Sequence, residues 1–138
     1  MGRSIFIADT TAEAVRAAAA DARITLHLTY GMSETCGGCV YDGVPLEGVI
    51  AEAVQGADGD TPRLRLSGPM VAAGYLDDPD RTAAHFGADG EQRWYLTEDT
   101  GTVQGAPGRQ LLTVTGRVDD VIITGGVKVS AARVQGVL

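Results

Sequence analysis

Positive charge is scarce in this chain. Its 138 residues carry 11 Lys and Arg against 18 Asp and Glu, which gives a formal net charge of −7 at pH 7, and Lys128 is the only lysine. General binding of nucleic acids depends on Lys and Arg side chains that neutralise phosphates. The charge balance therefore argues against a nucleic-acid partner.

Long apolar runs and targeting signals are missing as well. No apolar run approaches the roughly 18 residues that a membrane-spanning helix needs, and the N-terminus lacks the basic and apolar regions of a signal peptide. Position 6 is Phe6 rather than Ser or Thr, so the myristoylation pattern fails. We expect a cytoplasmic protein without a membrane partner. The apolar content of 44% suits one packed domain and argues against disorder.

Cysteine and histidine are scarce, and their spacing does not suit a conventional zinc site. The two cysteines, Cys36 and Cys39, form a single Cys-Gly-Gly-Cys, and the two histidines, His27 and His85, show no ligand spacing with them. A redox pair with this spacing needs a helix N-terminus to stabilise its thiolate, yet the sequence after Cys39 does not favour a helix. We favour cysteines without a chemical role in a Gly-rich turn, with a redox protein as an alternative.

The first thirty residues have the pattern of a βαβ unit. Residues 4–8 form a nearly continuous apolar strand, which suits a sheet covered on both faces. Thr10 and Glu13 have the spacing of a capping box, and residues 24–28 alternate as a second strand, which the crossover length places parallel to the first. The helix between them is predicted from apolar residues at helical spacing: Val15, Ala18, Ala19 and Ala22.

After residue 36 the pattern changes to short β segments separated by turns. Residues 48–54 and 63–66 flank a loop with the composition of a hairpin turn. A short helix is predicted from Asp78 to about Phe86, with Gly87 ending it. Further strands are predicted at residues 93–97, 111–115, 120–123 and 127–129, with Ser130 as the cap of a final helix. This pattern predicts an antiparallel barrel or sandwich over residues 36–118.

A cluster of polar side chains follows the second predicted strand. The strand stops at a Gly turn within the sequence LTYGMSET (residues 28–35). Ligands of open parallel sheets bind beyond the carboxyl ends of the strands. Ser33 and Thr35 offer hydroxyls to phosphate oxygens, and Glu34 offers a hard oxygen ligand to Mg²⁺, which needs only one or two protein carboxylates. The competing interpretation is a capped turn with Glu34 in solvent.

Four motifs, taken in order, resemble core motifs of the adenylate-forming superfamily, which comprises acyl-CoA synthetases, luciferases and the adenylation domains of peptide synthetases. They are YGMSET (30–35), GPMVAAGYL (68–76), WYLTEDTG (94–101) and GRVDDVIITGG (116–126). The stretch from Ser33 to Gly43 is most similar to o-succinylbenzoate–CoA ligases of menaquinone biosynthesis. The resemblance implies an enzyme that adenylates a small carboxylic acid with ATP and Mg²⁺ and then transfers the acyl group to CoA.

The resemblance also implies roles for individual residues. Tyr30 would pack against adenine, Thr35 would hydrogen-bond the α-phosphate, and Glu34 would coordinate Mg²⁺. Asp99 would accept hydrogen bonds from the ribose hydroxyls, and Arg117 would donate to the same region. The complete implied nucleotide site consists of Tyr30, Gly31, Met32, Ser33, Glu34, Thr35, Asp99 and Arg117.

Three more residues near the C-terminus receive roles from the resemblance. Asp119 matches the hinge about which the small C-terminal domain of these enzymes rotates, and Gly125 and Gly126 would line the CoA channel. Simpler interpretations compete with the nucleotide-binding roles of Asp99 and Arg117. In these interpretations Asp99 only caps a turn, and Arg117 makes a surface ion pair of at most about 1 kcal/mol.

The fold implied by the resemblance is α/β plus β. Residues 1–35 would end an α/β subdomain with a larger parallel sheet, residues 36–118 would form a β-barrel-like subdomain, and residues 119–138 would contain the hinge and the start of a C-terminal domain. Glu98 stands where the superfamily usually has glycine. A Lys-ended phosphate loop and the domain with the usual catalytic lysine are missing. We therefore expect a fragment that is inactive alone and whose exposed sheet edges favour self-association. The alternatives are a noncatalytic nucleotide-binding remnant and a structural β module.

Overall fold

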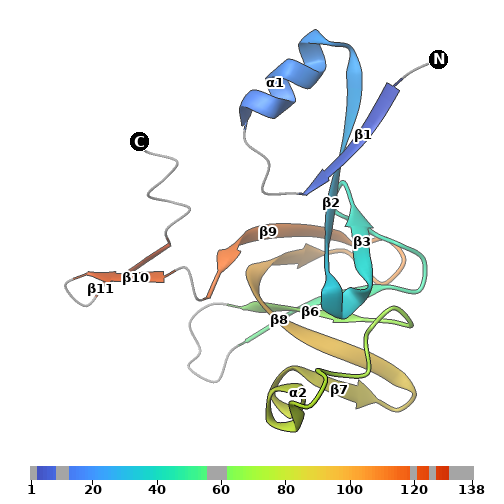
Figure 1. Cartoon of the computed structure of the whole chain (residues 1–138), viewed down its shortest axis with the longest axis vertical. Coiled ribbons are helices and arrows are strands. Elements are labelled where there is room, and N and C mark those ends of the chain that lie inside the picture. The colour runs from blue at the N-terminus through green and yellow to red at the C-terminus, as the bar shows by residue number, and fades with distance from the viewer. Residues whose placement is uncertain (1–2, 9–12, 56–61, 119–120, 125–126, 131–138) are drawn as a thin grey trace.

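The computed structural model describes residues 3–8, 13–55, 62–118, 121–124 and 127–130. Within these ranges the chain is mostly sheet with two α-helices, α1 and α2 (Figure 1). This agrees with the general fold class that the sequence predicts. No helix in the described ranges is long and apolar enough to cross a membrane.

The first sheet contains the N-terminal strands. Strands β1 and β2 pair in parallel, and helix α1 (Glu13–Asp21) connects them. Strands β3 and β4 extend the sheet in antiparallel fashion, so β2 leads from the α1 end of the molecule to the second sheet (Figure 1). The four strands, in the order β1-β2-β3-β4, are β1 (Arg3–Ala8), β2 (Ile24–Met32), β3 (Gly37–Tyr41) and β4 (Val44–Pro45).

The second sheet is antiparallel and is built around the long strand β8. The N-terminal half of β8 lies between β6 and β7, and its C-terminal half pairs with β9. The five strands are β5 (Ile50–Val54), β6 (Arg63–Ser67), β7 (Phe86–Asp89), β8 (Gln92–Gln104) and β9 (Leu111–Arg117). Helix α2 (Pro79–His85) precedes β7, and a separate hairpin contains β10 (Val121–Thr124) and β11 (Val127–Ser130).

The two sheets share one hydrophobic core. Its buried residues come from β3, from β5 and the preceding Val49, from β6 and from β9, with Leu64 and Leu66 fully buried. The backbone N–H of Leu112 in β9 also donates to the carbonyl of Gly43 at 2.7 Å. Tyr30 and Met32 at the end of β2, and Val103 of β8, pack against this core, which brings the predicted site residues of the two strands together.

Three local predictions differ from the structure. Strand β2 does not stop at Gly31 but continues to Met32, and β8 continues past residue 97 to Gln104. Both strands absorb the irregular residues through shifts in register instead of ending. The expected Gly-rich turn around the cysteines is strand β3, in which Gly37 and Gly38 pair with the end of β2.

The short helix agrees closely with its prediction. The Asp78 carboxylate accepts a hydrogen bond from the backbone N–H of Arg81 at 3.0 Å, as an N-cap does. The helix ends at His85, one residue earlier than expected, because Phe86 begins strand β7. Several predicted features lie outside the described residues: the Thr10 cap, the hinge at Asp119, the glycines Gly125 and Gly126, and the helix after Ser130.

Candidate functional site

A cleft of about 460 Å³ lies where the end of β2 and helix η1 (Ser33–Thr35) approach β8. Six residues of the predicted nucleotide site line this cleft, although their motifs are far apart in the sequence. They are Tyr30, Gly31, Met32, Glu34, Asp99 and Arg117. The remaining lining residues are Tyr75, Arg81, His85, Tyr95, Thr97 and Glu98.

Irregular strand pairing surrounds the cleft. The register shifts between Tyr30 and Gly31 where β2 pairs with β3, and it shifts again where residues 97–99 of β8 pass β6. A third shift, between Thr100 and Gly101, lies beside Arg117. Because extra residues in a strand redirect side chains and increase local twist, these irregularities allow side chains from neighbouring strands to converge on one space.

Asp99 forms the centre of one end of the cleft. Its Oδ2 accepts a hydrogen bond from the Tyr30 hydroxyl at 2.6 Å, and its Oδ1 lies 3.2 Å from Nη1 of Arg117. Burial, together with the hydrogen bond to Asp99, raises the pKa of Tyr30 far above its usual value, so this phenol remains a donor. Asp99 lies within strand β8, so the interpretation of Asp99 as a turn cap is wrong.

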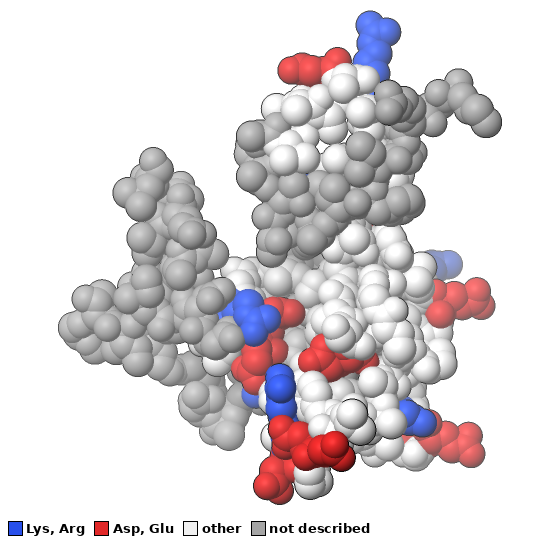
Figure 2. Space-filling model, viewed as in Figure 1, with Lys and Arg blue, Asp and Glu red and all other residues white. Residues whose placement is uncertain are grey.

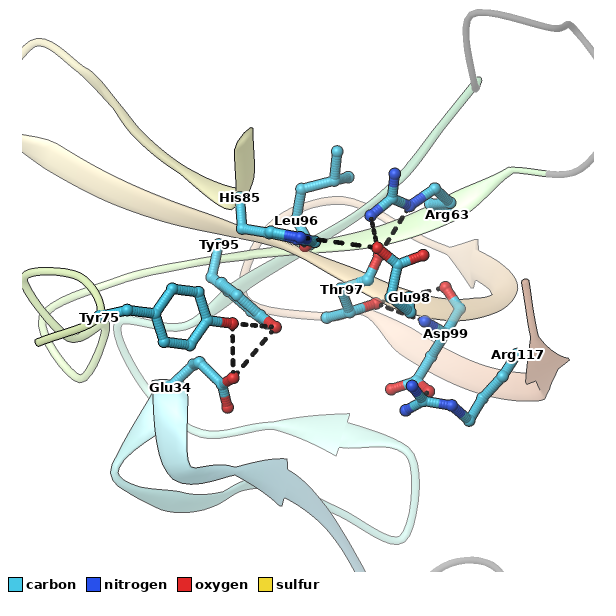
Figure 3. A network of polar contacts seen from close by, with 10 residues as sticks. All are labelled: Glu34, Arg63, Tyr75, His85, Tyr95, Leu96, Thr97, Glu98, Asp99 and Arg117. Carbon is cyan, nitrogen blue, oxygen red and sulfur yellow. Dashed lines mark hydrogen bonds and ion pairs between the residues drawn. The ribbon is translucent and has the colours of Figure 1, made fainter. Parts of the chain in front are cut away.

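Glu34 occupies the other end of the cleft. Its Oε1 accepts hydrogen bonds from the hydroxyls of Tyr75 at 2.7 Å and Tyr95 at 3.3 Å (Figure 3). Burial alone would raise the pKa of Glu34, but these hydrogen bonds, its own backbone N–H and the charge of Arg81 together lower it. Glu34 is therefore held as a carboxylate inside the cleft and not in open solvent.

The carboxylate of Glu34 fits the chemistry of a magnesium ligand. Mg²⁺ prefers oxygen ligands and is commonly bound by one or two carboxylates together with phosphate and water. Within the described residues, no group of three or more His, Cys, Asp and Glu side chains is arranged to hold a metal ion. Any Mg²⁺ at Glu34 would therefore take its other ligands from a phosphate-containing substrate and water.

Aromatic and basic side chains from α2 and the preceding loop close this end of the cleft. The Arg81 guanidinium lies 4.0 Å from the centre of the Tyr75 ring, and the His85 ring stacks on Tyr95 with centroids 6.0 Å apart. Tyr75 belongs to the motif GPMVAAGYL and Tyr95 to the motif WYLTEDTG. Their convergence on Glu34 depends on tertiary pairing, which the motifs alone do not predict.

Glu98 points away from Asp99 and has basic neighbours of its own. Its Oε1 lies 2.7 Å from Nη2 of Arg63 and 3.7 Å from Nε2 of His85 (Figure 3). On the face of the molecule seen in Figure 2, acidic and basic side chains of the lower half likewise lie side by side. The extra carboxylate that the sequence places next to Asp99 is thus paired with a cation.

Two predicted site residues do not line the cleft. Thr35 is 2% exposed, and its hydroxyl accepts a hydrogen bond from the Met32 N–H at 3.0 Å and lies 2.9 Å from the Gly37 carbonyl. Ser33 is exposed but is not part of the lining. In this arrangement the Thr35 hydroxyl stabilises the loop, and its contact with phosphate stays a prediction.

The cysteines have surroundings that do not suit redox chemistry. Both thiols are free, with Cys36 exposed and Cys39 2% exposed in strand β3. Burial raises the pKa of the Cys39 thiol, whereas reactive thiols have a lowered pKa and access to solvent. Cys39 belongs to the hydrophobic core, which gives it a structural role.

No protein-family model matches the chain. A relative in Mycobacterium tuberculosis, named "Probable 2-succinylbenzoate--CoA ligase", is 42% identical over 123 residues, which cover 88% of this chain and 29% of the relative. The chain thus spans about 29% of the length of this curated relative.

Solved structures of O-succinylbenzoate coenzyme A synthetase from Bacillus subtilis have a similar fold. The complex with AMP matches with a TM-score of 0.77 and 23% identity, covering 99% of this chain and 30% of the solved chain. The complex with ATP and magnesium ion matches with a TM-score of 0.74 and 23% identity, covering 98% and 30%.

The chain has the fold of a segment of the adenylate-forming enzymes, so the resemblance that its motifs predict is confirmed. Within that class, its sequence is similar to 2-succinylbenzoate–CoA ligases, as the stretch after Ser33 indicates.

Proposed function

We propose that the cleft is the nucleotide side of the active site of an ATP-dependent acid–CoA ligase. Such an enzyme joins a small carboxylic acid to AMP and then transfers the acyl group to CoA. The observation that carries the proposal is the convergence of Tyr30, Glu34, Asp99 and Arg117 in one cleft. The 42% identity to the mycobacterial relative supports 2-succinylbenzoate as the acid and menaquinone biosynthesis as the pathway.

The ribose of the nucleotide would bind at Asp99. A carboxylate only accepts hydrogen bonds, so it suits the two hydroxyls of a ribose, and a guanidinium supplies the complementary donors. Arg117 and the Tyr30 hydroxyl already orient the two oxygens of Asp99, at 3.2 and 2.6 Å. The ring of Tyr30 would then offer its face to adenine.

The phosphates would lie toward Glu34. Magnesium bound there would neutralise phosphate charge and polarise the α-phosphate toward attack by the substrate carboxylate. Glu34 would hold the ion, while the hydroxyls of Tyr75 and Tyr95 keep Oε1 in place at 2.7 and 3.3 Å. Arg81, at the same end of the cleft, adds a positive charge near the phosphates.

The same proposal assigns each part of the chain to a subdomain of the ligase. Residues 1–35 would end a larger parallel sheet, residues 36–118 would form a barrel-like subdomain, and residues 119–138 would contain the hinge at Asp119 and the CoA-channel glycines Gly125 and Gly126. Turnover would need parts of the ligase beyond the matched segment, since the chain spans about 29% of its relative. The cytoplasmic location and self-association through exposed edges stay predictions.

Calorimetric titration of the chain with AMP tests the proposal. We expect measurable binding that Asp99→Asn weakens about tenfold or more, because a hydrogen bond to a charged group contributes about 1.5–3 kcal/mol. Glu47→Gln, which removes a charge from an exposed side chain outside the cleft, is the matched control and should bind as the parent does. A structural β module would release no binding heat, and this result would overturn the proposal.

Pyrophosphate exchange with ATP and o-succinylbenzoate tests whether turnover needs parts of the ligase beyond the matched segment. We expect no appreciable exchange by the chain alone. Robust exchange that Glu34→Ala abolishes would contradict this expectation while supporting the assignment of the cleft.

A further inference from the structure

Arg63 lies behind the cleft, on the strand next to β8. Its Nε donates a hydrogen bond to the carbonyl of Thr97 at 2.8 Å, and its Nη2 contacts Oε1 of Glu98 at 2.7 Å. The side chains of Arg63 and Glu98 are 23% and 32% exposed, so the pair is only partly in contact with solvent. Arg63 itself does not line the cleft.

The contact with Thr97 supports the irregular part of β8. In the pairing of β6 with β8, Arg65 lies opposite Leu96 and Arg63 lies opposite Thr100. The three residues 97–99 of β8 therefore face a single residue of β6. The Thr97 hydroxyl accepts the backbone N–H of Asp99 at 3.0 Å, and Arg63 binds the Thr97 carbonyl. Because a bulge interrupts the regular ladder of hydrogen bonds, these two side chains replace part of the missing support of the backbone that carries Asp99.

The contact with Glu98 changes the electrostatics of the cleft. Three carboxylates line it, those of Glu34, Glu98 and Asp99, against the two guanidinium groups of Arg81 and Arg117. Such a surplus of negative charge opposes the binding of a triphosphate, since like charges placed together are costly. Arg63 supplies a further positive charge directly on Glu98, at 2.7 Å.

We infer that Arg63 is a positioning residue that makes the cleft compatible with a polyphosphate: it holds residues 97–99 in place and neutralises Glu98. This inference rests on the proposed function. His85 is the other basic neighbour of Glu98, but at 3.7 Å it makes the weaker contact. Removal of Arg63 therefore leaves Glu98 largely uncompensated, and this charge penalises ATP more than an uncharged nucleoside.

Calorimetric titrations with ATP in the presence of Mg²⁺, and with adenosine, separate charge from shape. For Arg63→Gln we expect a loss of ATP affinity about tenfold larger than its loss of adenosine affinity. Glu98→Gln leaves Arg63 with an unpaired positive charge, so it should bind ATP more tightly than the parent and change adenosine affinity less. Arg63→Gln combined with Glu98→Gln should recover most of the lost ATP affinity, as coupled charges do. Arg109→Gln, at an exposed position outside the cleft, is the charge-matched control.

Arg63→Lys separates the two parts of the inference and also serves if Arg63→Gln does not fold. Lysine keeps the charge but cannot bridge the Thr97 carbonyl and Glu98 in the same way. We expect it to weaken ATP and adenosine equally, by about threefold. Binding of both ligands as in the parent would overturn the positioning role.

The outcomes distinguish this inference from the proposed function. Equal losses of ATP and adenosine affinity in Arg63→Gln, without recovery in the double variant, would overturn the electrostatic role and leave the nucleotide site standing. A parent chain that binds neither ligand would overturn the proposed function, and the inference with it.

Discussion

The two walls of the cleft are fixed by different means. On the wall formed by β2 and η1, the backbone itself is packed tightly: a Cβ on Gly31 would collide with the carbonyl of Gly37, and the buried Thr35 hydroxyl hydrogen-bonds the backbone of Met32 and Gly37. On the wall formed by β8, side chains hold the irregular residues 97–99. There Arg63 binds Thr97 and Glu98, and Arg117 binds Asp99.

This difference separates stability from ligand binding. Substitutions in the first wall must disturb the backbone or leave buried polar groups without partners, and both effects destabilise the fold. The ion pairs of the second wall are partly exposed, so their net contribution to folding is small. We therefore expect the first wall to control mainly stability and the second mainly affinity.

The largest effect on stability is expected for Gly31→Ala. The added methyl group would meet the carbonyl of Gly37 and the Cα of Gly38, neither of which can move without shifting β3. We expect a loss of about 3 kcal/mol in the free energy of unfolding, at the upper end for overpacking. Denaturant unfolding of the chain measures this loss.

Gly90→Ala is the control for Gly31→Ala. Gly90 has a φ of 65° and open space around it, so its substitution adds only left-handed backbone strain, which costs about 1–2 kcal/mol. Equal losses for Gly31→Ala and Gly90→Ala would mean that the first wall is not held by its tight backbone contact.

A smaller effect is expected for Thr35→Val. Valine keeps the shape of threonine but leaves the backbone N–H of Met32 without its partner at 3.0 Å, at a cost of about 1–3 kcal/mol. The matched control, Thr113→Val at an exposed position of β9, should change stability by less than about 0.5 kcal/mol. If Thr35→Val instead leaves thermal unfolding unchanged and reduces AMP affinity, Thr35 contacts the phosphate as its motif predicts.

The sequence predicts which residues form the site better than it predicts the contacts that hold them in place. Tyr30, Glu34, Asp99 and Arg117 each stand in a recognisable motif, and they line one cleft. The bulge at residues 97–99 depends on the register between β6 and β8, and register is a tertiary property that alternation along one strand does not reveal. For the same reason the strand predicted at residues 93–97 is shorter than β8, and the contact of Arg63 with Glu98, 35 residues apart, does not follow from the sequence.

The smallest effect is expected at the base of the first wall, for Asp42→Asn. The Asp42 carboxylate binds Nδ1 of His27 at 2.7 Å and the backbone N–H of Leu28 at 2.8 Å. These hydrogen bonds lower the pKa of Asp42, so its stabilising effect is present above the unfolded pKa of about 3.9 and is lost as the pH falls through the lower folded pKa.

Melting temperatures of the parent and of Asp42→Asn at several pH values test this expectation. The variant should melt slightly below the parent at neutral pH, and the difference should vanish in acid. Asp77→Asn, an exposed carboxylate beside α2, is the control and should follow the parent throughout. A large loss at neutral pH for Asp42→Asn would mean that a side-chain contact holds the first wall as well, because a wall held by its backbone barely responds to one exposed carboxylate.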